Sequence, residues 1–272
     1  MLRVLILTNK DLTSNIIFSG LFEKEEVDVL GVVETGTLTK NKNYLWGSFQ
    51  LLSRIHYTYW LFLVITNTLF HLRNLVTFAF GWKYSLKWNA RKRSIPVSTC
   101  FDFSSDLFLN YVKKLSPDLI IVRVNQILKQ ELLSLPKYGV WCVHSSLLPS
   151  YQGIAGEFHA MARGETKVGS SIFQVKLKLD SGEVIQRGSV EVDRDLLSTI
   201  IRNNESAATL LANTVQSLSQ LGVIHVAKNQ NFNQSYFSWP TKDDLVLFHK
   251  TGSTLIGSIG LKKLFEILVT KS

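Results

Sequence analysis

The chain of 272 residues contains only two cysteines, Cys100 and Cys142. Two cysteines give neither a disulfide framework nor the ligand spacing of a metal site. The sequence therefore predicts a protein of the reducing cytoplasm that binds no metal.

Long apolar runs are also missing. The apolar part of residues 1–10 is shorter than a signal peptide requires, and it reads instead as a first strand. Polar residues interrupt the stretch 57–70 before it reaches the roughly 20 residues of a transmembrane helix. The apolar fraction of 46% still indicates a folded protein with a large core.

Acidic residues are absent between positions 36 and 101, although the chain has 21 of them. The same stretch holds nine of the 30 basic residues and four of the six tryptophans. All of the excess positive charge therefore lies in one insertion, at about residues 40–93. This composition is typical of an interfacial helix on an anionic membrane. A helical subdomain over the active site, a dimer contact and a nucleic-acid patch are the alternatives.

The remaining periodicity indicates an α/β protein. Residues 2–8 and 27–33 have the pattern of strands on either side of a helix at 15–22. Residues 119–124 form a continuous apolar strand apart from Arg123, as in a parallel sheet. Further predictions are strands at 140–143, 168–175 and 183–192 and helices at 106–115, 154–162 and 198–221. The first strand–helix turn has no glycine, so we expect no phosphate loop there.

The fold class that follows is a doubly wound α/β fold around a mostly parallel sheet. Residues 1–222 are predicted to form one domain that carries the helical insertion. Residues 223–272 are predicted to form a short C-terminal extension.

A candidate acid–base site lies in the middle of the chain. His144 follows the strand 140–143, and Cys142 shares its face because alternate strand residues point the same way. Asp180 lies in a turn that contains Gly182. Histidine, with an ordinary pKa near 6.5, can exchange protons at neutral pH, and a carboxylate can orient it.

The order of these residues resembles the formyltransferases that use 10-formyltetrahydrofolate. This family includes glycinamide ribonucleotide transformylase, methionyl-tRNA formyltransferase and the amino-sugar N-formyltransferases. The resemblance rests on His144, the Ser-Leu-Leu-Pro sequence at 146–149, Gly153, Val168-Gly169 and the Asp-Ser-Gly sequence at 180–182. Residues 117–128 resemble the strand and folate-pocket loop of the family. One position departs: the family's asparagine, two residues before the histidine, falls on Cys142.

The resemblance implies an N-formyltransferase with a fold of the formyltransferase type. Such an enzyme moves the formyl group of 10-formyltetrahydrofolate to a primary amine of a small acceptor, with an amino sugar as one candidate. His144 would meet the oxyanion or handle protons, and Asp180 would orient that histidine. The folate would lie against Asn125, Gln126, Ile127, Leu128, Ser146, Leu147, Leu148 and Pro149.

Cys142 leaves several outcomes open, because a thiol is a weaker hydrogen-bond donor than an amide. The loss of one oxyanion donor typically costs about 3 kcal/mol of transition-state stabilisation. The protein is then a slow transferase, or a transferase in which another residue such as Asn125 supplies the hydrogen-bond donor. The third outcome is a weakened or inactive folate-binding protein, which could also be located at the membrane periphery. A nucleophilic Cys142 beside His144 is a less favoured mechanism.

The predicted partners are a small amine acceptor, folate and, through residues 40–93, an anionic membrane surface. A homodimer is also compatible with the sequence. Methionyl-tRNA formyltransferases carry a β-rich C-terminal domain that helps to hold tRNA, and residues 223–272 leave little room for one. Nucleic acid is therefore not expected. The predicted location is the cytoplasm, with the membrane periphery as the alternative.

Overall fold

A computed structural model describes residues 1–35, 52, 55–177, 182–224, 226–227 and 233–270, the side chains of 77–80 excepted. Its main feature is a seven-stranded sheet of order β3-β2-β1-β4-β5-β7-β8. The first five of these strands are mutually parallel, and β7 is antiparallel to both of its neighbours. The strands are β1 (Leu2–Asn9), β2 (Val27–Thr35), β3 (Val97–Thr99), β4 (Leu119–Arg123), β5 (Val140–His144), β7 (Lys167–Gln174) and β8 (Val184–Glu191). The predicted mostly parallel sheet is confirmed.

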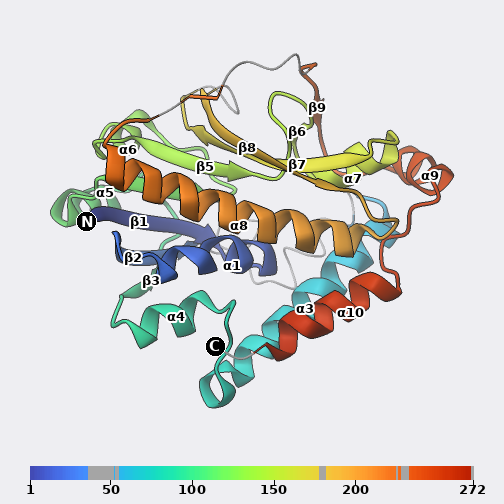
Figure 1. The fold of residues 1–272 in the computed structure, drawn as a ribbon, viewed down its shortest axis with the longest axis horizontal. Coiled ribbons are helices and arrows are strands. Elements are labelled where there is room, and N and C mark those ends of the chain that lie inside the picture. The colour runs from blue at the N-terminus through green and yellow to red at the C-terminus, as the bar shows by residue number, and fades with distance from the viewer. Residues whose placement is uncertain (36–51, 53–54, 178–181, 225, 228–232, 271–272) are drawn as a thin grey trace.

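Helices cover both faces of this sheet (Figure 1). On one face α1 (Leu12–Ser19) and α8 (Leu196–Leu221) bury the side chains of one core cluster. On the other face α5 (Asp106–Leu115) and α6 (Gln130–Leu133) enclose a second cluster. The strands are apolar on both sides because both sides are covered. The doubly wound arrangement is confirmed.

Side-chain caps explain why two helices begin earlier than predicted. The Asp11 carboxylate accepts from the backbone N–H of Ser14, so α1 starts at Leu12 rather than at residue 15. A 3-10 helix, η1 (Gly20–Glu23), follows it. The Asp195 carboxylate likewise accepts from the N–H of Ser198 and starts α8 at Leu196. By contrast, α7 (Gly156–Ala162) starts two residues later than predicted, after Ala155 with φ of 55°.

The insertion, which was predicted to be helical, forms two helices within its described part. Helix α3 (Tyr57–Phe80) buries one stripe of side chains, and α4 (Leu86–Lys92) packs against α1 and β2. The stripe consists of Tyr59, Phe62, Thr66 and Phe70. Residues 40–51 and 53–54 of the insertion lie outside the described residues. No helix in the described ranges is both long and apolar enough to cross a membrane.

The C-terminal stretch packs against the body of the protein. Strand β9 (Tyr236–Phe237) pairs in parallel with β6 (Gln152–Gly153), next to the loop that precedes α7. Helices α9 (Lys242–Lys250) and α10 (Ser258–Val269) follow. A third core cluster joins α3, α7, α8, α9 and α10. The division of the chain at residue 222 remains a prediction. The shared core connects residues on both sides of this boundary.

Candidate functional site

Three parallel strands end at one edge of the sheet. Asn9, Arg123 and His144 are the last residues of β1, β4 and β5, which are neighbours in that order. In the register of these strands, Thr8 lies beside Arg123 and Val122 beside Cys142. Open α/β sheets bind ligands at the carboxyl ends of their strands. This carboxyl edge is therefore the candidate site.

The structure places Cys142 and His144 at the carboxyl end of β5. His144 is half-buried and lies opposite Ser171 of β7. Cys142 is half-buried between β4 and β7 and packs against the core cluster of the α5 face. By strand alternation the two side chains share a face. Their chemical roles remain predictions.

Asp180 lies outside the described residues, so its place relative to His144 also remains a prediction. The ends of the surrounding hairpin are described. A Cβ added at Gly182 would lie 1.5 Å from the carbonyl oxygen of Gln174. Only glycine permits this close approach of β7 and the segment that leads into β8.

The Ser-Leu-Leu-Pro loop is fixed by bonds from β7 and β8. The backbone N–H of Leu148 donates to Ser171 Oγ at 2.9 Å, and the Ser171 hydroxyl donates to the Ser146 carbonyl at 2.7 Å. Arg187 Nε donates to the Leu148 carbonyl at 2.8 Å. Leu148 is buried, whereas Leu147 is half-buried and lines a cavity of about 100 Å³ between the loop, α7 and β7. The loop backbone is therefore rigidly held.

The loop after β4 divides into accessible and structural residues. Asn125 and Ile127 are exposed and available to a ligand. Gln126 Nε2 donates to Thr35 Oγ1 at 2.7 Å, and Leu128 is buried in the core. Of the four predicted folate contacts in this loop, two are thus already used to attach it to the sheet.

A buried polar cluster adjoins His144 and was missed from the sequence. Glu157 of α7 is 6% exposed and accepts from Asn203 Nδ2 at 2.9 Å and from the Ser145 hydroxyl. Arg123 Nη2 lies 3.4 Å from Ser145 Oγ. The one sequence signal was Arg123, the charge that interrupts an otherwise apolar strand. Nothing in the sequence could have joined it to residues 157 and 203.

Electrostatics within this cluster act in opposite directions. Burial raises the pKa of Glu157, while the hydrogen bonds from Asn203 and Ser145 and the charge of Arg123 oppose the rise. A buried carboxyl with a raised pKa next to a cleft is a common feature of functional sites.

Several buried polar atoms near this edge have no hydrogen-bond partner among the described residues. They are Asn9 Oδ1, Arg123 Nε and Ser146 Oγ, which come from the ends of β1 and β4 and from the loop after β5. Buried polar atoms in folded proteins are nearly always paired. The carboxyl edge is therefore polar beneath its surface as well as at it.

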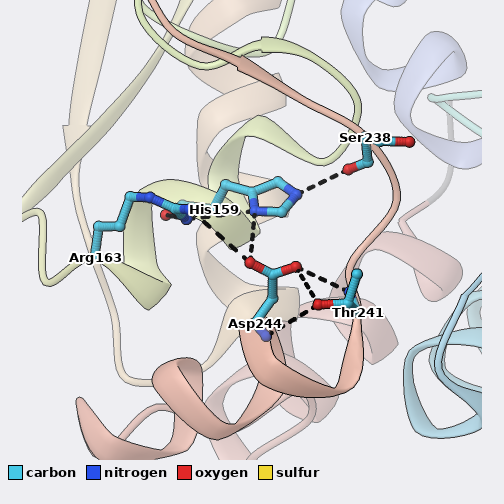
Figure 2. A network of polar contacts seen from close by, with 5 residues as sticks. All are labelled: His159, Arg163, Ser238, Thr241 and Asp244. Atoms are coloured by element: carbon cyan, nitrogen blue, oxygen red, sulfur yellow. Dashed lines mark hydrogen bonds and ion pairs between the residues drawn. The ribbon is translucent and has the colours of Figure 1, made fainter.

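His159 belongs to a different network, which joins α7 to the C-terminal stretch (Figure 2). Its Nε2 donates to the Ser238 carbonyl at 2.9 Å, and its Nδ1 lies 3.8 Å from the Asp244 carboxylate. Thr241 and Asp244 form a capping box at the start of α9. His159 is 2% exposed, so this histidine is structural.

The pKa values of His159 and Asp244 are both lower than usual, for different reasons. Burial lowers the pKa of His159, and the Ser238 and Asp244 contacts offset only part of that effect. For Asp244, burial alone would raise the pKa. Hydrogen bonds from the Thr241 backbone N–H and hydroxyl, together with the charges of His159 and Arg163, outweigh this effect. The pKa of Asp244 is therefore below its ordinary value.

Comparison with known proteins extends this description. Residues 103–209 match the model of the formyl transferase family. Methionyl-tRNA formyltransferase of Clostridium acetobutylicum is 33% identical over 160 residues, which is 57% of this chain and 51% of that protein. The chain thus spans about half the length of this relative.

Solved structures share the fold at low sequence identity. A phosphoribosylglycinamide formyltransferase from Anaplasma phagocytophilum has a TM-score of 0.57 at 17% identity, covering 87% of this chain and 98% of that one. An N-formyltransferase from Helicobacter canadensis, in complex with folinic acid and dTDP-3-aminofucose, has a TM-score of 0.53 at 15% identity, covering 90% and 72%.

The chain therefore has a doubly wound α/β fold like that of these formyltransferase structures. Residues 103–209 are thus similar to the formyl transferase family, and this similarity covers the candidate site.

Proposed function

We propose that this protein is an N-formyltransferase that moves a formyl group from 10-formyltetrahydrofolate to a primary amine of a small acceptor. The amine nitrogen forms a bond to the formyl carbon, and the bond between that carbon and N10 of the folate breaks. One amine proton passes in net to N10, which yields a formamide and tetrahydrofolate. No step requires a metal.

The observation that carries the proposal is the position of His144. It ends β5 at the carboxyl edge of the sheet, directly before the fixed Ser-Leu-Leu-Pro loop. A histidine here can take the amine proton or donate a hydrogen bond to the oxygen that becomes negative. Asp180 would orient this histidine, as the family resemblance implies.

The proposed folate site lies between two loops. Asn125 and Ile127 line it from the end of β4, and Leu147 and Pro149 line it from the end of β5. The folinic acid in the Helicobacter canadensis structure supports a folate donor here.

An amino sugar is the acceptor that we propose. The unpaired Asn9 Oδ1 is an acceptor, Arg123 Nε is a donor and the Ser146 hydroxyl is both. An acceptor rich in hydroxyl groups, such as a sugar, suits this polar edge of the sheet. The dTDP-3-aminofucose in the same solved structure supports this class of acceptor.

The test is an assay with 10-formyltetrahydrofolate and a panel of amines that includes nucleotide-linked amino sugars, glycinamide ribonucleotide and methionyl-tRNA. We expect a product that carries one additional formyl group with an amino sugar. Formation of no formylated product from any amine would contradict the proposed reaction.

Cys142 favours a second candidate, a weakened or inactive folate-binding protein on the same scaffold. Cys142→Asn separates the two because the amide restores a strong donor, which is worth about two to three orders of magnitude in rate. We expect this variant to transfer formyl faster than the wild type. Cys100→Asn is the control, because Cys100 follows β3, which β2, β1 and β4 separate from β5. If both forms bind folate and neither transfers formyl, the binding-protein alternative is correct.

Two partner predictions also belong to the proposal. We propose contact between the basic insertion and an anionic membrane surface, and we regard the homodimer as its competitor. Helices α3 and α4 of the insertion allow the residues of the proposed membrane contact to be named.

A further inference from the structure

Helix α3 exposes a continuous apolar stripe. Its 24 residues include one stripe that is buried and an opposite stripe that faces solvent. Leu75 is 77% exposed and Leu72 is 55% exposed. The exposed stripe follows the three- and four-residue spacing of one helical face and consists of Leu61, Ile65, Thr68, Leu72, Leu75 and Val76. Its only polar member is a threonine.

Helix α10 adds further exposed apolar side chains, although an ion pair of Lys262 and Glu266 lies on its exposed surface as well. Figure 1 shows α3 and α10 lying together below α8, against which α10 also packs. Arg73 Nε of α3 donates to the Leu268 carbonyl of α10, and Trp82 Nε1 donates to the Ile267 carbonyl at 2.7 Å. The exposed side chains of α10 include Leu261, Phe265 and Val269, with Phe265 66% exposed. Large exposed apolar surfaces of this kind mark interaction sites.

Positive charge borders these two helices. Lys83 follows α3, and its backbone N–H donates to the Thr270 carbonyl at the end of α10. Exposed Lys87, Arg91, Lys92 and Arg93 lie in or next to α4 on the same side of the molecule. Glu34 pairs with Lys87, but no acidic residue occurs in the sequence between positions 36 and 101.

The charge decides between two occupants of this surface. A two-fold dimer would bring the same patch of each copy together and so place basic residues against basic residues. Like charges across an interface are unfavourable. An anionic bilayer would instead attract the basic residues and accept the apolar stripes.

We propose that the exposed faces of α3 and α10, bordered by the basic residues 83–93, form a docking surface for an anionic lipid bilayer. The apolar side chains enter the headgroup boundary, and the basic side chains contact lipid phosphates. The proposed surface thus includes α10, whereas the sequence predicted a membrane contact through the insertion alone.

The docking surface lies near the candidate site. Lys87 of α4 forms an ion pair with Glu34 at 3.4 Å, close to the carboxyl end of β2, and Asn15 of α1 accepts from the N–H of Leu86. Docking would therefore bring the carboxyl edge close to the bilayer. If the proposed formyl transfer is correct, an acceptor at the membrane surface could reach it.

The experiment is flotation of the full chain with vesicles of phosphatidylcholine alone or mixed with phosphatidylglycerol. We expect flotation with the mixed vesicles only, and its loss in added salt. A Leu72→Gln, Leu75→Gln, Phe265→Gln triple variant should lose at least tenfold in vesicle affinity. The matched control is Leu107→Gln, because Leu107 is 84% exposed on α5 outside this surface.

Variants that remove charge test the contribution of the basic residues to vesicle binding. Lys92→Gln with Arg93→Gln should reduce affinity for the mixed vesicles about fivefold for each charge removed. Lys113→Gln with Lys114→Gln, which removes two exposed charges of α5, should leave it unchanged. Circular dichroism verifies that every variant is folded.

Three results would overturn the proposal. They are failure to float with the mixed vesicles, equal flotation with neutral vesicles, and a concentration-dependent dimer that the triple variant converts to a monomer. The last result would assign the surface to a second copy of the chain. Formylation of a water-soluble amine is measured in parallel. Flotation without transfer would refute the proposed enzyme activity and leave the docking surface in place.

Discussion

Two histidines fifteen positions apart have opposite environments, and the difference assigns them different tasks. His144 ends a strand at the carboxyl edge and is half-buried. His159 is almost fully buried between Phe158, Phe237 and the Ser238 carbonyl. Their environments lead to a paired prediction.

We expect His144→Gln to lower kcat/KM for formyl transfer about 10²- to 10⁴-fold, the usual contribution of a general acid or base. The melting temperature should stay close to that of the wild type. His159→Gln should do the reverse and lower the melting temperature with a smaller effect on rate. Melting curves and single-turnover rates of both variants test this pair. Equal rate losses in the two would show that His144 has no special role.

Glu157 gives a prediction on pH. Burial raises its pKa above the ordinary value of 4.5. As pH rises above 4.5, the unfolded chain loses this proton while the folded protein retains it. The free energy of unfolding therefore falls as pH rises through the raised pKa. Glu157→Gln removes the ionisable group, so the wild type should lose stability relative to the variant over this window. Melting curves from acidic to neutral pH test it, and a constant difference would contradict it.

At the level of residues, the sequence could predict the strand-end position of His144 but could not reveal its surroundings. The alternation along β5 was sufficient to place Cys142 and His144. Glu157 looked like an ordinary helical residue, because its burial depends on Asn203 of α8, 46 positions away. Asp180 remains a prediction.

Among the elements, α9 is attached through contacts that depend on pH. His159 has a lowered pKa in the folded protein, mainly because of burial. As pH falls below its ordinary 6.5, the unfolded chain takes up a proton before the folded protein does, so stability is lost on acidification. Asp244 also has a lowered pKa, so its contribution is lost when pH falls below about 3.8.

We therefore expect the amide protons of residues 236–250 to be less protected from exchange at pH 5 than at pH 7. The amide protons of the central sheet are the reference at each pH. Hydrogen exchange followed by mass spectrometry measures this directly. In His159→Gln the pH dependence between these values should disappear. An unchanged dependence in the variant would mean that another group controls the attachment.

The elements show where local sequence signals are sufficient. Helix α5 occupies the predicted residues 106–115, because Ser105 caps it and Ser116 ends it in the left-handed conformation. The start of α7 was misplaced, because its boundary depends on the backbone conformation of Ala155 rather than on apolar periodicity. The pairing of β6 with β9 joins residues more than 80 positions apart, and two-residue strands have no pattern of their own.

At the level of the whole molecule, the insertion and the C-terminal stretch form one core with the α/β body. Phe70, Trp82, Leu196, Phe248 and Leu264 belong to the same buried cluster. The prediction of a short C-terminal extension from residue 223 is therefore open to a direct test.

Leu264 of α10 is 2% exposed, and we expect Leu264→Ala to cost about 2–5 kcal/mol of unfolding free energy for the entire chain. Urea unfolding, followed by both circular dichroism and tryptophan fluorescence, should show one transition at a lower midpoint. Leu261→Ala, at a site that is 53% exposed on the same helix, is the control and should change little. Two separate transitions, with only the smaller one shifted, would support an independent extension.

The two-residue ladder between β6 and β9 also limits how this protein can be recombined with its relatives. Gly153 has φ of 94°, and a Cβ on it would lie 2.1 Å from the Phe237 carbonyl oxygen. A chimera that exchanges everything after residue 222 would place a foreign strand against Gly153, whose backbone is fitted to the close approach of Phe237. Grafts of a donor tail should therefore carry the donor's segment equivalent to 149–156 with it.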